Sequence, residues 1–250
     1  MSQLALAGEA EISTRHLSFL ETGRSAPSRD MVLRLADRLA VPLRDRNILL
    51  VAAGYAPMFP ERTLGDPALQ AARRAVDLVL QGHEPYPALA VDRHWTLLAA
   101  NKAATRLLAG TAPALLQPPV NVLRLSLHPD GLVPRIVNLA EWRAHLLARL
   151  RHQIEVSADP TLVALVDELR AYPAPRKTRP DGPVVNDRYA GTVVPLQLVT
   201  DVGTLALIST TTIFGTPIDV TLSELAIESF FPADAATAET LRHLADDVAR

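Results

Sequence analysis

The chain has 250 residues, with 25 basic against 27 acidic side chains, a formal net charge of −2 and no cysteine. With so balanced a charge, an anionic partner must be attracted by a local basic patch and not by the molecule as a whole. The lack of cysteine excludes disulfides, thiolate metal sites and cysteine nucleophiles, and it is consistent with a reducing compartment. Because there is neither a signal sequence nor a run of about 18 apolar residues, the sequence predicts a soluble, cytoplasmic protein.

Residues 1–57 are predicted to form a bundle of short helices. Ser13 and Ser28 each precede apolar residues at helical spacing, and a serine in that position caps a helix by accepting a hydrogen bond from one of its first amides. Gly54 is placed to end the last helix. The expected helices span residues 2–10, 13–20, 28–40 and 41–54, and a linker rich in proline and glycine follows at 58–67.

The first two helices predict a helix-turn-helix. Apolar residues suited to the seam between them are Ala7, Ile12, Leu17 and Leu20. The outer face of the second helix then enters the major groove, where arginine bonds guanine and a methyl group or an aromatic ring contacts thymine. The residues predicted to read bases are Thr14, Arg15, Ser18 and Phe19. Those predicted to bind phosphate are Gln3, Thr22, Arg24, Ser25 and Arg29. The alternative for both sets is a solvated helix surface, and for Phe19 also the edge of the core.

This segment resembles the helix-turn-helix of Cro and the phage repressors, the XRE class. The matching residues are Ser2, Gln3, Ala7, Ala10, Ser13, Leu17, Ser18, Glu21 and Gly23. The family has a glycine in the turn where this chain has Glu11, so we expect a non-glycine residue at positive φ, with a strain of about 1 kcal/mol. The family also has a helix before Ser-Gln. The sequence therefore predicts an all-α bundle that lacks its first helix.

The remainder, residues 68–250, mixes helix and strand. Expected helices cover 67–81, 101–110 and 159–172. A long amphipathic helix is expected at 135–156, because Leu139, Trp142, Leu146 and Leu150 share one face. Residues 86–101 predict two strands around a turn, and 191–232 predict an antiparallel meander of about three strands. The segment between 111 and 134 is expected to be mostly loop, and 172–183 to be a basic, proline-rich loop.

The same region resembles the ligand-binding domain of the MmyB-like transcription regulators. The segments that carry the likeness are "GYAP", "LAVDRHWTLLAANKAATRLL", "LRLSLHPDGLVPRIVNLAEWRAHLLARLRHQ" and the closing meander. The resemblance implies a PAS-like α+β domain, in which helices pack around a small antiparallel sheet. It also implies that the domain holds a fatty acid or a similar apolar molecule.

Candidate residues for lining an apolar pocket are Trp95, Val122, Leu125, Leu132, Trp142 and Leu146. The alternative is ordinary core packing, since tryptophan on an amphipathic helix is usually buried there. A carboxylate head group would need a basic partner, and four residues were considered for that role: His128, Arg135, Arg143 and His145. For each of these, a capped turn or a surface charge is the simpler interpretation.

The motifs of an enzyme are missing: there is no Gly-rich phosphate loop, no H-E-x-x-H and no G-x-S-x-G. We therefore expect no catalysis, no cofactor and no metal. The sequence predicts a bacterial transcriptional regulator that binds a double-stranded operator as a homodimer, and whose second domain senses a small apolar ligand, such as a fatty acid. One alternative is a lipid or acyl sensor that acts through protein contacts, its truncated DNA-binding domain being non-functional. Another is a small-molecule hydrolase built on the same pocket.

Overall fold

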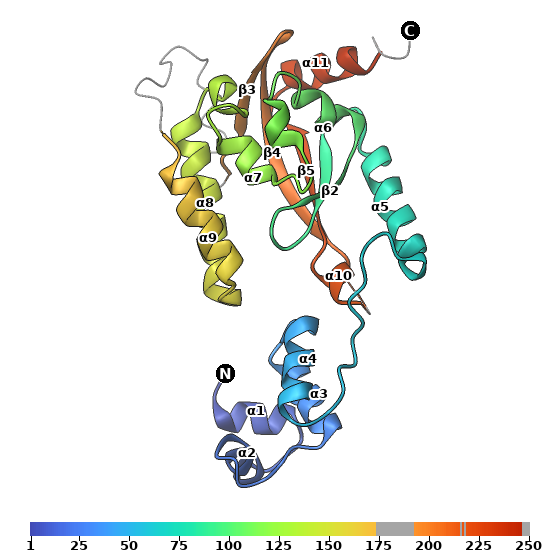
Figure 1. Cartoon of the computed structure of the whole chain (residues 1–250), viewed down its shortest axis with the longest axis vertical. Coiled ribbons are helices and arrows are strands. Elements are labelled where there is room, and N and C mark those ends of the chain that lie inside the picture. The colour runs from blue at the N-terminus through green and yellow to red at the C-terminus, as the bar shows by residue number, and fades with distance from the viewer. Residues whose placement is uncertain (174–192, 216, 218, 247–250) are drawn as a thin grey trace. The chain divides into compact units, whose positions relative to one another are not determined.

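The computed structural model describes residues 1–173, 193–215, 217 and 219–246, and the chain divides into two compact units. The first unit comprises residues 1–70 and 214–224, and the second comprises residues 71–213 and 225–250. Figure 1 shows the course of the chain through both. Most of the basic, proline-rich loop expected at 172–183 lies outside the described residues.

The first unit is helical, as the sequence predicts. Its helices are α1 (Gln3–Glu9), α2 (Thr14–Glu21), α3 (Arg29–Arg38), α4 (Leu43–Ala52) and the short α10 (Val220–Ser223). The hydroxyls of Ser13 and Ser28 accept hydrogen bonds from amides in the first turns of α2 and α3, which confirms their predicted role as caps. Gly54 follows the end of α4 with a φ of 85°, the left-handed conformation that glycine adopts without strain.

The turn between α1 and α2 contains the strained residue expected from the sequence. Glu11 has a φ of 56°. It is held there because the amides of Glu11 and Ile12 donate to the carbonyls of Gly8 and Ala7, at 3.2 and 3.0 Å. The turn sets α1 and α2 around a core of small and aliphatic side chains. The buried apolar residues of this unit are Ala7, Ala10, Leu17, Val32, Ala36 and Leu50.

Residues 214–224 leave the sheet of the second unit and belong to the first. The amide of Val220 donates to the carbonyl of Pro60 at 2.9 Å, and the hydroxyl of Thr221 donates to the carbonyl of Arg62 at 2.5 Å. Arg62 in turn reaches the buried Asp219 at 3.2 Å. On α4, Arg44 donates to both carboxylate oxygens of Glu224, at 2.7 and 3.0 Å.

The second unit has a five-stranded antiparallel sheet in the order β2-β1-β5-β4-β3. The strands are β1 (Ala88–Val91), β2 (Leu97–Ala100), β3 (Leu196–Thr200), β4 (Gly203–Ile213) and β5 (Ala226–Pro232). The predicted strand pair is thus β1 and β2, and the predicted meander is β3, β4 and β5. Burial alternates along β3, where Leu196 and Leu198 reach the core, whereas β4 buries the consecutive residues Leu205, Ala206 and Leu207.

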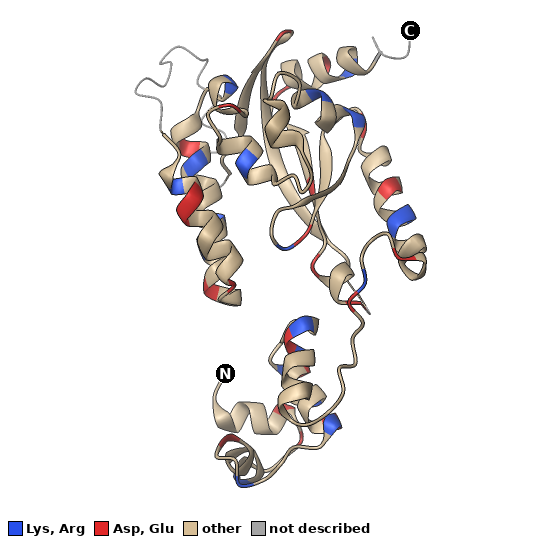
Figure 2. Cartoon of the chain, viewed as in Figure 1, with Lys and Arg blue, Asp and Glu red and all other residues tan. Residues whose placement is uncertain are grey.

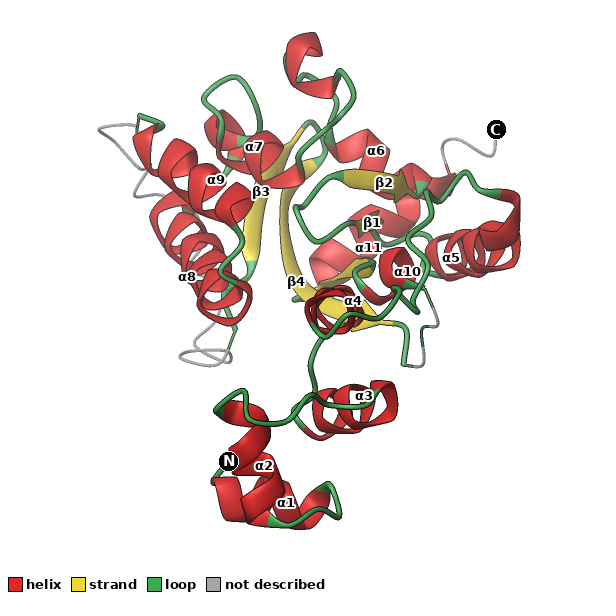
Figure 3. Ribbon diagram, turned by 60° about the horizontal axis from the view of Figure 1, so that its bottom comes forward, coloured by secondary structure: helices red, strands yellow, loops and turns green. Residues whose placement is uncertain are grey.

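Helices cover this sheet. They are α5 (Gln70–Gly82), α6 (Lys102–Leu107), α7 (Val122–Leu127), α8 (Leu139–Ser157), α9 (Pro160–Ala171) and α11 (Ala235–Asp246), with 3-10 turns η1 (Pro67–Leu69), η2 (Pro113–Leu116) and η3 (Val133–Arg135). The helices α7, α8 and α9 lie on one side of β3 and β4, and α11 lies on the other (Figures 1 and 3). The predicted face of α8 is buried, because Leu139, Trp142, Leu146 and Leu150 are each at most 5% exposed.

Three helices were not predicted as such: α7, α10 and α11. Helix α7 forms inside the segment expected to be mostly loop, because Asn121 Oδ1 accepts from the amides of Leu123 and Arg124 and so caps it. Helix α11 closes the chain after β5. The whole is an α+β fold with a helical first unit, as the sequence predicts. Within the described residues, no helix combines the length and the apolar character needed to cross a bilayer.

Candidate functional site

The second helix of the helix-turn-helix presents the predicted base-reading residues on its outer side. Thr14 and Arg15 are exposed, and Ser18 and Phe19 are half-buried. The guanidinium carbon of Arg15 lies 5.4 Å from the centre of the Phe19 ring, within range of a cation–π attraction. The ring therefore positions the guanidinium on the face of α2 that the buried Leu17 does not occupy. These residues lie together, and their contact with DNA remains a prediction.

The predicted phosphate-binding residues surround α2. Arg24 and Arg29 are exposed, and Ser25 is half-buried. Gln3 Nε2 donates to Glu21 Oε2 at 2.6 Å, which joins the start of α1 to the end of α2. The hydroxyl of Thr22 donates to the Ser18 carbonyl at 2.7 Å, so its oxygen is fixed at the end of the helix. Basic and acidic residues both occur over this unit (Figure 2), so any phosphate contact depends on these local groups.

A cavity of about 100 Å³ lies inside the second unit. All six residues named from the sequence line it: Trp95, Val122, Leu125, Leu132, Trp142 and Leu146. The rest of the wall is mainly aliphatic, and the polar lining residues are Ser126, Arg149, Ser209 and Glu228. Since an apolar cavity of about 150 Å³ can stay dry and bind benzene, this space suits a small apolar group. Ligand contact by the six residues stays a prediction.

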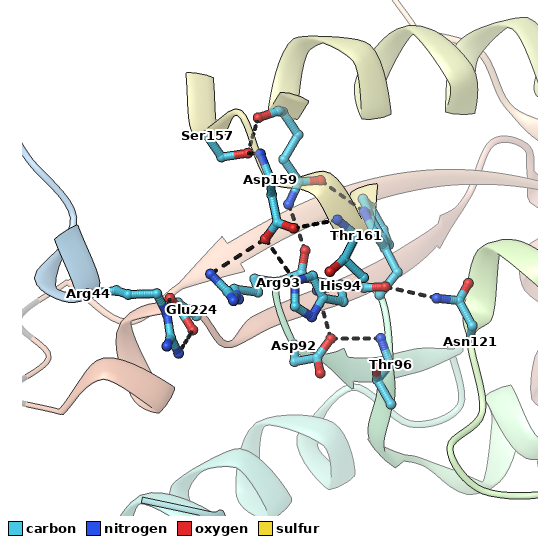
Figure 4. A network of polar contacts seen from close by, with 12 residues as sticks. Arg44, Asp92, Arg93, His94, Thr96, Asn121, Ser157, Asp159, Thr161 and Glu224 are labelled. Atoms are coloured by element: carbon cyan, nitrogen blue, oxygen red, sulfur yellow. Dashed lines mark hydrogen bonds and ion pairs between the residues drawn. The ribbon is translucent and has the colours of Figure 1, made fainter. Parts of the chain in front are cut away.

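Trp95 enters the cavity from a strained turn between β1 and β2. Its φ is 66°, an unusual value for a bulky side chain. The carboxylate of Asp92 accepts from the amides of His94 and Thr96, both at 2.8 Å, and Asn121 Nδ2 donates to the His94 carbonyl (Figure 4). These bonds fix the turn on both sides of Trp95. A strained residue held by its surroundings in this way is characteristic of binding sites.

On α8, Trp142 forms a second wall. Its Nε1 donates to Ser126 Oγ at 2.9 Å, so both polar atoms are satisfied within the apolar lining. The ring of His145 stacks on Trp142, with 5.5 Å between ring centres. Burial lowers the pKa of His145, the positive charge of Arg149 lowers it further, and the nearby Glu228 carboxylate acts in the opposite direction. His145 is therefore held towards its neutral form.

Two residues of the cavity wall, Arg149 and Glu228, belong to a polar cluster from three elements. Arg149 on α8 donates to both oxygens of Glu228 on β5, at 2.7 and 3.1 Å, and to Thr211 on β4 at 2.8 Å. Thr211 donates to Glu228 at 2.7 Å and stands directly opposite it in the β4–β5 register. The Arg149 guanidinium also lies 4.7 Å from the centre of the Trp95 ring. The Glu228 side chain is only 5% exposed.

Comparison with known proteins agrees with these two units. The family described as "MmyB-like transcription regulator ligand binding domain" matches residues 72–244, and the family described as "Helix-turn-helix" matches residues 1–45. The first match covers more than half of the chain. The chain belongs to the MmyB-like transcription regulators. It thus pairs a DNA-binding helix-turn-helix with the ligand-binding domain of a transcription regulator.

Other comparisons add little to the MmyB-like assignment. No curated protein sequence matches this chain. A solved structure described as "Structure of an RNA-binding Light-Oxygen-Voltage Receptor" is 15% identical over 98% of this chain and has a TM-score of 0.25. This chain covers 57% of that one, and a likeness so slight carries no argument.

In this MmyB-like domain, the four basic residues considered for a carboxylate do not line the cavity. Arg135 donates to the carbonyls of Leu107, Ala109 and Val199, and Arg143 donates to those of Leu169, Arg170 and Tyr172. His128 Nδ1 accepts from the amide of Asp130 and closes a turn. His145 stacks on the outside of Trp142. The simpler interpretation of a capped turn holds for His128, whereas Arg135 and Arg143 are half-buried and bond main-chain carbonyls, so they are not the surface charges that were expected.

Sequence reasoning missed Arg149 and Glu228, although both leave a signal. Arg149 follows Trp142 by seven residues and Leu146 by three, which is the spacing of one helix face. Glu228 lies two residues before Phe230 in a strand, so both side chains point to the same side of the sheet. A lone acid on the apolar face of a strand and an arginine on the apolar face of a helix predict a buried pair.

Proposed function

We propose that this protein regulates transcription by binding operator DNA through α2 and by sensing a small apolar ligand, such as a fatty acid, in the cavity of its second unit. The observation that carries the proposal is the cavity itself. It is walled by aliphatic and aromatic side chains with a few polar ones among them, which is the usual character of a small-molecule site.

The DNA-binding part of the proposal rests on the outer face of α2. Arg15 and Thr14 point away from the core and would read base edges, with Ser18 and Phe19 beside them. The phosphate contacts would come from Gln3, Thr22, Arg24, Ser25 and Arg29. Because one recognition helix reads only a few base pairs, we propose a homodimer on a palindromic operator.

A route from ligand to DNA follows from the course of the chain. Ser209 on β4 and Glu228 on β5 line the cavity, and the segment 214–224 that joins these strands belongs to the first unit. A change in the two strands on ligand binding would therefore act on α10, and through Arg44 and Glu224 on α4. The ligand must favour one of two arrangements for this coupling to exist.

The test is fluorescence anisotropy of the whole chain on duplex DNA from the upstream region of its own gene, measured across a salt series. We expect binding that weakens steeply with salt. Arg15→Ala should cost about 1–3 kcal/mol on the preferred sequence and reduce discrimination between sequences. Arg38→Ala is the matched control, because Arg38 is an exposed arginine on α3 in the same unit.

If the wild-type chain binds no DNA at low salt while it still binds an apolar ligand, the operator-binding part falls. The alternative of a lipid or acyl sensor that acts through protein contacts would then replace it. If the two arginine variants lose sequence preference equally, α2 is not the recognition helix.

A further inference from the structure

One arginine joins helix α8 to the two strands that flank the segment 214–224. Arg149 donates to both carboxylate oxygens of Glu228 on β5, at 2.7 and 3.1 Å, and to the hydroxyl of Thr211 on β4, at 2.8 Å. Within the described part of the chain, no other hydrogen bond connects α8 with β4 or β5. Arg149 is therefore the polar link between this helix and the strand pair.

The link lies close to the point where the chain leaves the sheet. Thr211 and Glu228 stand opposite each other in the β4–β5 register, and the last pair of that register is Ile213 with Ala226. The hydroxyl of Thr211 also donates to Glu228 at 2.7 Å, so the side chains tie the two strands together here. Because residues 214–224 belong to the first unit, the position of this pair sets where that segment leaves the sheet.

The same arginine is bound to the wall of the cavity. Arg149 and Trp95 both line it, and the guanidinium carbon lies 4.7 Å from the centre of the indole ring. Gln153, one turn further along α8, accepts a hydrogen bond from Trp95 Nε1 at 3.0 Å. Helix α8 thus holds the ring on its face and at its N–H. A molecule in the cavity would pack against this ring and so restrain the guanidinium stacked on it.

The contact between Arg149 and Glu228 does not separate easily. The Glu228 side chain is only 5% exposed, and a buried carboxylate that loses its cation is strongly unfavourable. Arg149 therefore stays bonded to the strands when Trp95 is restrained, and the restraint reaches β4 and β5. Coupling between distant parts of a protein needs such a chain of packed and hydrogen-bonded side chains, with an equilibrium that the ligand can shift.

We propose that Arg149 is the residue through which the second unit senses an occupied cavity, because it couples Trp95 in the wall to Thr211 and Glu228, and through them to the segment 214–224. A bound molecule restrains this joint, so the ends of β4 and β5 and the segment between them open less often. The inference rests on the proposed ligand-sensing function and assigns the positioning residues that transmit it.

The experiment is hydrogen exchange of the whole chain, read by mass spectrometry with and without decanoate and in the absence of DNA. The fluorescence of Trp95 and Trp142 first shows whether decanoate binds, because both line the cavity. We expect bound decanoate to slow the exchange of the amides of residues 212–226 by at least about fivefold, which is the lower end of the usual coupling between two sites.

The variant Thr211→Val removes the hydroxyl that bonds both partners and keeps the branched shape of the side chain. Thr211 is exposed and is not a residue of the cavity wall, so the variant should fold and bind decanoate with unchanged affinity. The slowing of exchange at 212–226 should nevertheless fall towards none. Thr212→Val is the matched control, because this exposed neighbour points to the opposite face of the sheet and should keep the full effect.

A second variant tests the arginine itself. Arg149→Lys keeps a positive charge beside the buried Glu228, but an ammonium lacks the planar fork that bonds Glu228 and Thr211 together and stacks on Trp95. We expect the effect of decanoate on residues 212–226 to be lost here as well. If Arg149→Lys does not fold, the comparison of Thr211→Val with Thr212→Val decides the matter.

If decanoate binds to the wild type without slowing exchange at 212–226, the inference is wrong and the proposed ligand-sensing function still stands. Failure of decanoate to bind would overturn the proposed sensing of a fatty acid in this cavity, and the inference with it. An undiminished effect in Thr211→Val or in folded Arg149→Lys would show that the coupling does not pass through this contact. Equal losses in Thr211→Val and Thr212→Val would assign the effect to the stability of β4 and would also overturn the inference.

Discussion

Arg149 and Trp95 stack in the wall of the cavity, with 4.7 Å between the guanidinium carbon and the centre of the ring. The contact joins the middle of α8 to the turn between β1 and β2. Trp95 has a φ of 66°, and the turn around it is fixed by Asp92 and Asn121. Since a cation is attracted to the face of an indole ring, the strained turn and the arginine stabilise each other. This part of the cavity wall is thereby fixed before any ligand binds.

Gly131 is predicted to tolerate no side chain. A Cβ at this position would lie 2.2 Å from the carbonyl oxygen of Leu125, in the backbone that places Leu125 and Leu132 in the cavity wall. We expect Gly131→Ala to destabilise the second unit by about 1–3 kcal/mol. Tryptophan fluorescence during urea unfolding measures this, because both tryptophans lie in that unit. Gly82→Ala is the control, since its Cβ would meet no atom within 4 Å; an equal loss there would refute the steric explanation.

Replacing Glu11 by glycine is predicted to stabilise the first unit. The residue has a φ of 56°, where a side chain costs of order 1 kcal/mol and glycine costs nothing. Far-UV circular dichroism during thermal unfolding should show a gain of about 1 kcal/mol, reduced somewhat by the greater entropy of unfolded glycine. Glu9→Gly, inside α1, should change stability in the opposite direction. Two changes of the same sign would contradict the strain at the turn.

Asp159 is predicted to make the second unit sensitive to acid. Burial would raise its pKa, but hydrogen bonds from His94 and from the amide of Thr161, with the charge of Arg93, outweigh burial and lower it. A carboxyl whose folded pKa lies below its unfolded value, about 3.9, stabilises the protein above that value. This contribution is lost as the pH falls through the folded pKa.

The variant Asp159→Asn keeps a residue able to cap α9, and it removes the charge together with one of the two acceptor oxygens. We expect it to lower stability at neutral pH by about 1–3 kcal/mol and to flatten the loss of stability on the acid side. Urea unfolding at a series of pH values measures both effects. Asp167→Asn on the same helix should change little, because its side chain is 66% exposed. If the free energy of unfolding of Asp159→Asn falls with decreasing pH as steeply as that of the wild type, the charge of Asp159 does not cause the acid sensitivity.

The pair Arg44–Glu224 is predicted to transmit ligand binding to DNA binding. Glu224→Gln should weaken the effect of an apolar ligand on DNA affinity, because it loosens the contact between α4 and the segment 214–224. Ligand affinity of the DNA-free protein should stay the same. Anisotropy titrations of DNA with and without ligand give the coupling free energy, which is typically about 1–3 kcal/mol. The value for the variant is compared with the value for the wild type.

Glu61→Gln is the matched control, since Glu61 pairs with the same arginine from the linker and not from the segment between β4 and β5. A larger loss of coupling in Glu61→Gln than in Glu224→Gln would place the route in the linker instead. A loss of ligand affinity in Glu224→Gln would show that the variant disturbs the cavity and not the transmission.

Most of the helices and strands could be predicted from local signals in the sequence. A serine before an apolar run predicted the starts of α2 and α3, and helical spacing predicted the buried face of α8. The same spacing placed Trp142 and Leu146 in the cavity wall. The same helical spacing, continued seven residues beyond Trp142, also predicts that Arg149 faces the cavity. These features depend on a few neighbouring residues, so the sequence determines them without knowledge of the tertiary fold.

The features that were missed depend on distant contacts. Arg44 and Glu224 are 180 residues apart, and nothing in the turn-like sequence around 214–224 shows that it leaves the sheet for another unit. The pairing of Arg149 with Glu228 spans 79 residues and requires the strand register to be known. Helix α7 depends on a cap by Asn121, whose side chain can equally close a turn, so composition alone indicated a loop.

Because residues 214–224, between β4 and β5, belong to the first unit, the DNA-binding unit of this chain cannot be exchanged as one continuous segment. A chimaera cut only in the linker would separate Val220, fully buried in this chain, from Pro60, the carbonyl partner of its amide. The helices of the new DNA-binding unit would then be combined with residues 214–224, whose side chains pack against the original helices. A chimaera that keeps these contacts therefore has to transfer residues 1–70 and 214–224 together, because both segments belong to the first unit.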